Sequence, residues 1–64
     1  MKDVLQQFLN QKVKLVKDDG FVIWGKIIAV HDDCIEFFTD GRTTVLSFDR
    51  IKEIVPLDRR GDAP

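Results

Sequence analysis

The sequence predicts a mainly β domain in which a short N-terminal helix precedes a five-stranded, strongly bent antiparallel sheet. Three observations support this fold class. The spacing of apolar residues changes from a period of about 3.6 to a period of 2 near Lys12. The pairs Asp19-Gly20 and Asp40-Gly41 are typical of hairpin turns between alternating runs. The connections are too short for parallel crossovers, so neighbouring strands are expected to run antiparallel.

The helix is expected over residues 2–11, because Val4, Leu5, Phe8 and Leu9 fall on one helical face. The expected strands are residues 12–18, 21–30, 34–39, 42–48 and 51–55. Residues 1–57 would form a single domain and residues 58–64 a flexible tail.

Three shorter features add detail to the predicted fold. Gly25 interrupts the longest apolar run and predicts a sharp bend, which should curl the sheet into a small, partly open barrel. Residues 48–50 suggest a single 3₁₀ turn, and Pro56 is expected to stop the last strand.

Composition argues against several function classes. The chain has 64 residues, a net charge of −1, one cysteine, one histidine and no tyrosine. A single cysteine, Cys34, can form neither an intrachain disulfide nor a multi-cysteine zinc site. A pocket of convergent catalytic groups is hard to build from so few suitable residues, so we expect no catalysis, metal or cofactor.

The small size of the domain predicts that binding to something else contributes to its stability. A domain this small buries only about 60% of the surface that its unfolded chain exposes, which leaves its stability marginal. A ligand, a protein partner or self-association is therefore expected. No apolar stretch approaches the roughly 20 residues of a membrane helix, and the start of the chain lacks a signal-peptide pattern, so a cytoplasmic protein is expected.

Residues 12–31, KVKLVKDDGFVIWGKIIAVH, combine an alternating strand, an Asp-Gly turn and a central glycine, and the last strand runs into Val55-Pro56. With the order of one helix and five bent strands, this pattern resembles the Sm-like family and is closest to its bacterial Hfq-type RNA chaperones. The likeness covers about residues 4–56. It implies a non-catalytic homo-oligomeric ring of five to eight subunits, with six favoured, that binds single-stranded RNA.

Two stretches depart from the family pattern. His31 stands where the family usually has an aspartate, and Asp33 stands where Hfq has an aromatic residue that stacks on uracil. Ser47-Phe48-Asp49-Arg50 replaces the Arg-Gly of Sm proteins or the Tyr-Lys-His of Hfq. The resemblance therefore implies a degraded uracil-binding pore. The candidate pore-side residues are His31, Asp32, Asp33, Phe48, Asp49 and Arg50.

RNA-binding candidates lie on the first two strands and their turn: Lys14, Lys17, Gly20, Phe21 and Trp24, with Lys12 as a further lysine. Trp24 should lie on the strand face opposite Ile23 and Ile27, where its indole could stack on a base. Alternatively, Trp24 packs beneath the helix or at a subunit interface. The lysines either contact phosphates or form an ordinary solvated face.

The edge strands suggest how copies could associate. Pairing residues 42–47 of one copy with residues 51–55 of the next would satisfy both open edges of the sheet. Such a head-to-tail contact must close into a ring or continue as a fibre. Two alternatives stay open: a ring scaffold that binds protein and not RNA, and a small barrel that remains monomeric.

Overall fold

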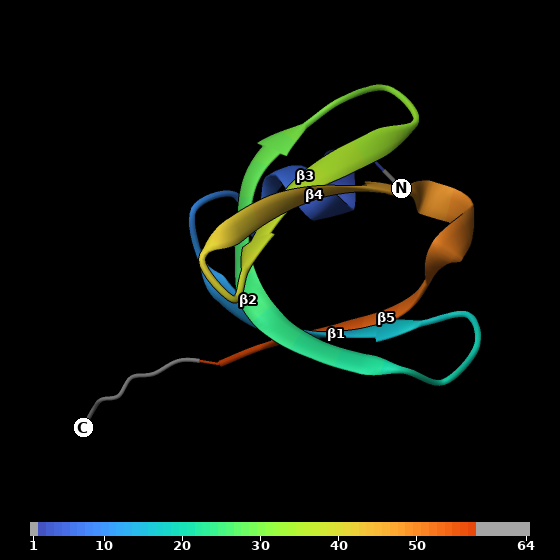
Figure 1. Cartoon of the computed structure of the whole chain (residues 1–64). Helices are drawn as coiled ribbons and strands as arrows, with labels where there is room; N and C mark the ends of the chain where they lie inside the picture. The colour runs from blue at the N-terminus through green and yellow to red at the C-terminus, as the bar shows by residue number, and fades with distance from the viewer. Residues whose placement is uncertain (1, 58–64) are drawn as a thin grey trace.

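The computed structural model describes residues 2–57, and these form one short helix and one five-stranded antiparallel sheet (Figure 1). The elements are α1 (Lys2–Gln6), β1 (Lys12–Lys17), β2 (Val22–Val30), β3 (Cys34–Thr39), β4 (Arg42–Ser47), the 3₁₀ helix η1 (Phe48–Arg50) and β5 (Ile51–Pro56). The predicted mainly β class, with one helix and five antiparallel strands, is confirmed. The expected flexible tail, residues 58–64, lies outside the described residues.

The predicted helix over residues 2–11 is too long, since α1 ends at Gln6. After it, the backbone N–H groups of residues 7, 8 and 9 each donate to a carbonyl three residues back, which tightens the chain. Asn10 then adopts φ 67°, a left-handed conformation that stops a helix. Its N–H donates to the Ile27 carbonyl of β2 at 2.6 Å, so a contact with the sheet replaces further helical turns.

The strands follow the order β4-β3-β2-β1-β5, which makes β2 the central strand and leaves β4 and β5 at the two edges. Figure 1 shows β2 curving from the pair β1 and β5 toward β3 and β4, so that the sheet curls without closing. A bulge between Ile27 and Ala29 shifts the pairing with β3 by one residue and adds to the curvature.

The final strand includes Pro56, one residue beyond the expected end. Proline is tolerated there because β5 is an edge strand and needs no further N–H at that point. Pro56 lies opposite Val13 of β1, and the Leu57 N–H donates to the Lys12 carbonyl at 3.0 Å.

The core lies inside the curl of the sheet. Its six fully buried side chains are Leu5, Val13, Leu15, Ile27, Ile35 and Phe37. Five of them come from strands with alternating inward and outward residues, and Leu5 is the one contributed by α1. Phe8 and Leu9 pack against this core, whereas Val4 is exposed. None of the helices within residues 2–57 has the length and apolar character needed to span a bilayer.

Gly25 allows β2 and β3 to approach each other closely. A Cβ atom added to Gly25 would lie 2.1 Å from the Phe38 carbonyl oxygen and 2.8 Å from the Phe37 ring. No side chain larger than hydrogen fits without moving backbone. The glycine in the longest strand therefore permits the tight passage of β3 over the bend of β2.

Replacing Gly25 with alanine should destabilise the domain by about 3 kcal/mol or more, because backbone and a core ring must both move. Gly41→Ala is the control: its added Cβ meets nothing within 4 Å, but φ is +76°. The left-handed conformation alone costs about 1–2 kcal/mol. Urea unfolding followed by circular dichroism measures both losses. Equal losses would contradict the close approach at Gly25.

Candidate nucleic-acid interface

An apolar groove crosses the outer face of the sheet at its centre. It has a volume of about 500 Å³ and is lined by Lys12, Trp24, Gly25, Lys26, Ile28, Phe38 and Leu57. Trp24 is 58% exposed and Phe38 44% exposed, although both are large aromatic side chains. Single exposed apolar residues are ordinary, but several gathered around one hollow are typical of a binding surface.

Strand alternation explains why these residues share a face. Trp24, Lys26 and Ile28 occupy every second position of β2, opposite the inward-facing Ile23 and Ile27. In the sheet register Lys26 lies between Lys12 of β1 and Phe38 of β3. The expected face of Trp24 is thus observed. The alternative in which Trp24 packs beneath the helix is wrong.

The lysines along the groove have no carboxylate partner among residues 2–57. The ion pairs in that part of the chain are Lys2–Asp32, His31–Glu36 and Arg50–Asp18. Lys14 lies directly opposite Trp24 in the pairing of β1 with β2, and Lys12 lies opposite Lys26. Three positive charges therefore surround the exposed indole without an internal counter-ion from the described residues.

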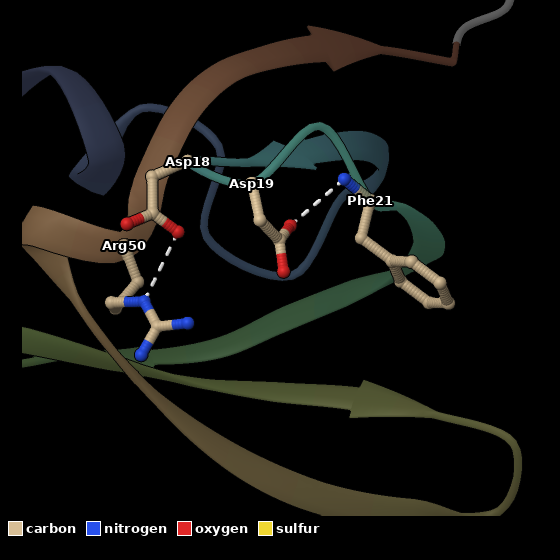
Figure 2. Close-up of polar contacts among 4 residues, drawn as sticks. All are labelled: Asp18, Asp19, Phe21 and Arg50. Carbon is tan, nitrogen blue, oxygen red and sulfur yellow. Dashed lines mark hydrogen bonds and ion pairs between the residues drawn. The ribbon is translucent and has the colours of Figure 1, made fainter.

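The turn between β1 and β2 is held by two polar contacts (Figure 2). The Phe21 N–H donates to Asp19 Oδ1 at 2.9 Å, and this bond lowers the pKa of the Asp19 carboxyl. Arg50 Nε donates to Asp18 Oδ1 at 3.1 Å, which ties η1 to the turn. Gly20 has φ 89°, a left-handed conformation that glycine adopts without strain.

Phe21, in the turn, is the most exposed aromatic residue within residues 2–57, at 65%. Its ring projects away from the Asp18–Arg50 pair (Figure 2). The Lys17 ammonium lies 5.8 Å from the ring centroid. Phe21 and Lys17 line a second hollow of about 400 Å³, which lies between the two hairpins and also includes Arg42. Phe21 and Trp24, grouped as RNA contacts by sequence reasoning, thus line two different hollows.

The two stretches of pore-side candidates, residues 31–33 and 48–50, meet at one backbone hydrogen bond, and several of their side chains have partners within the chain. His31 Nε2 lies 2.8 Å from Glu36 Oε2, and Asp32 pairs with Lys2, whose ammonium lowers the pKa of the Asp32 carboxyl. Asp33 accepts a bond from the Phe48 N–H through its backbone carbonyl. Among residues 2–57 no group of three metal-ligating side chains occurs.

Phe48 and Arg50 are already engaged within the chain. Phe48 is half-buried and packs against the core. Arg50 pairs with Asp18 of the turn. Asp49 remains exposed. Cys34 is half-buried, and burial raises the pKa of its thiol, which favours the unreactive protonated form.

Sequence reasoning missed four of the groove residues: Lys26, Ile28, Phe38 and Leu57. Lys26 and Ile28 could have been found, because they continue the alternation that begins at Trp24. Phe38 and Leu57 belong to other segments and join the groove only through the pairing of β3 with β2 and the exit of β5 beside β1.

Comparison with known proteins identifies no family, because neither a protein-family model nor a curated protein sequence matches the chain.

Trp24 is the only tryptophan, so its fluorescence reports on the groove alone. Because 58% of the side chain is exposed, acrylamide should quench the folded protein almost as strongly as the urea-unfolded protein. Phe38→Trp in a Trp24→Phe background places a matched reporter on the neighbouring strand and should be quenched similarly. Strong protection of either tryptophan would contradict an open groove.

Proposed function

We propose that the chain is an Sm-like subunit that assembles into a closed ring through its two sheet edges. The support is the strand order: β4 and β5 lie at opposite ends of a sheet that does not close on itself. β4 carries one charged residue, Arg42, and its central Val45 is 63% exposed, so this edge lacks the charges that protect monomeric proteins. Pairing of β4 with β5 of the next copy satisfies both edges in a head-to-tail contact.

Ring assembly predicts a solution mass of several chains, with six favoured by the Hfq-like pattern. Val45→Lys should reduce the mass to that of a single chain, because a charge at the centre of an edge strand opposes pairing. Val45→Thr keeps the branched shape without the charge and should retain the assembly. Native mass spectrometry and sedimentation measure all three proteins. A wild-type protein of single-chain mass would overturn the ring.

We further propose that the assembled subunits bind single-stranded RNA without catalysis. One observation carries this proposal: an exposed tryptophan in an apolar groove, surrounded by three lysines that no described carboxylate neutralises. An aromatic face stacks on a base of any sequence, and lysines contact the backbone phosphates. Phe21 and Lys17 at the turn provide a second aromatic and basic pair that could contact the same strand.

In a ring, the repeated grooves would raise the affinity for RNA above that of a single groove. Each copy in a ring presents one groove, so a bound strand that reaches several grooves gains affinity through effective concentration. The net charge of −1 does not oppose this mechanism, because the groove lysines and the acidic turn at residues 31–33 belong to different parts of the surface.

Fluorescence anisotropy with labelled A-rich and U-rich oligomers tests RNA binding. Three phosphate contacts per site predict that affinity falls roughly 20-fold between about 50 and 200 mM salt. Trp24→Ala should weaken binding about 5- to 150-fold, the value of one stacked base, and Trp24→Phe should retain part of it. Lys2→Ala, on α1 outside the groove and the edge strands, is the matched charge control and should change little, because its exposed pair with Asp32 contributes little to stability.

A protein-binding ring scaffold is the second candidate function. It is favoured by the mainly apolar lining of the groove and by the pore-side residues, where Phe48 packs on the core and Arg50 is paired with Asp18. Absence of RNA binding at low salt, in a protein that still assembles, would favour this scaffold over the RNA-binding ring.

A further inference from the structure

The groove contains a cross-strand pair of like charges. Lys12 of β1 and Lys26 of β2 lie directly opposite each other in the register, and both line the groove. Like charges in this arrangement destabilise an antiparallel pair. No carboxylate among residues 2–57 forms an ion pair with either ammonium. The free protein therefore holds two cross-strand lysines beside one apolar hollow, and an anion bound between them would offset their repulsion.

The lysine pair favours an anion that carries more than one negative charge. A phosphodiester within an RNA strand carries one negative charge, whereas a terminal phosphate monoester carries about −1.5 to −2 near pH 7. The two positive charges of the lysines match the charge of the monoester, whereas the diester neutralises only one of them. A carboxylate carries a single charge as well, so it satisfies the pair no better than the diester does.

The rest of the groove fits the group attached to such a phosphate. Lys26 lies next to Phe38 in the register, and Trp24 is two residues before Lys26 on the same strand face. The two aromatic side chains are exposed and border the same hollow as the lysine pair. Its volume of about 500 Å³ is within the range that holds one small organic group.

We propose that this groove binds the terminal nucleotide of a single-stranded RNA, with the terminal phosphate monoester between Lys12 and Lys26 and the base against Trp24. The proposal rests on the RNA-binding function proposed above and adds the part of the RNA that the groove selects. Lys14, which lies opposite Trp24, would contact the next phosphate of the strand. In a ring, one subunit would then hold the chain end, and the grooves of neighbouring subunits would contact the following nucleotides of the same strand.

The test compares one short A-rich oligomer with four ends: 5′-hydroxyl, 5′-phosphate, 5′-phosphate capped as its methyl ester, and 3′-phosphate. Each is titrated into the full-length protein at one salt concentration, with Trp24 quenching and anisotropy as readouts. The 5′-phosphate oligomer should bind about tenfold tighter than the 5′-hydroxyl oligomer, because it adds charge-assisted hydrogen bonds. The methyl ester restores a single charge and should lose most of this gain.

The four oligomers have distinguishable outcomes. A gain with the 5′-phosphate alone assigns the groove to 5′ ends, and an equal gain with the 3′-phosphate supports a terminal phosphate of either end. Equal binding of all four would overturn the end preference and leave the RNA-binding function standing. Absence of binding by any oligomer would overturn both proposals.

Lysine variants identify the phosphate contact. Lys12→Gln and Lys26→Gln should each abolish the preference for the phosphorylated end, while Lys2→Gln, on α1 outside the groove and the edge strands, should retain it. Removing one member of the like-charge pair should also raise the urea midpoint of the free protein slightly. A higher urea midpoint shows that the variants are folded. It also argues against a purely structural role for the lysine, whose removal would lower the midpoint. Retention of the preference in both groove variants would contradict the assignment.

Discussion

The close passage of β3 over β2 at Gly25 is the constraint on which the rest of the structure depends. Because Gly25 has no side chain, the Phe38 carbonyl and the Phe37 ring can occupy the space where a Cβ would stand. β2 can therefore bend at its middle and pair with β1 at one end and β3 at the other. The bend turns a flat sheet into a curled one, and the inward side chains of neighbouring strands then meet in a single core. A core assembled in this way is small, which suits a chain of 64 residues.

The same bend leaves two features unsatisfied. The sheet curls without closing, so no strand among residues 2–57 pairs with the outer edges of β4 and β5. Within the same residues no layer packs on the outer face at the bend, because α1 contributes its one buried side chain, Leu5, to the inside of the curl. Trp24 and Phe38 consequently remain exposed around a groove. Both features arise because a small domain has too little chain to cover its own sheet, and the proposed self-association and ligand binding would make use of them.

Charge is distributed unevenly over this scaffold. Three acidic residues of the turns are paired with cations or hold the backbone: Asp18 with Arg50, Asp32 with Lys2, and Asp19 with the Phe21 N–H. These contacts are exposed, so each contributes little to stability and serves mainly to orient the turns. The lysines of the groove, in contrast, have no such partner among residues 2–57. The chain thus combines a net charge near zero with a local group of unpaired lysines, so the net charge does not describe the charge of the groove.

The sequence by itself determined the features that depend on near neighbours. The change of period at Lys12, the Asp-Gly turns and the bend at Gly25 are local properties of the backbone. The resemblance placed Trp24 on the face opposite Ile23 and Ile27, and the structure decided that this side chain is exposed. Only the tertiary structure decided where α1 ends, because Asn10 bonds to Ile27 of β2. It also decided that Phe48 packs on the core, that Arg50 pairs with Asp18, and that Phe38 and Leu57 complete the groove. These contacts join residues far apart in the chain, and their partners are selected by the curvature of the whole sheet, which no local pattern encodes.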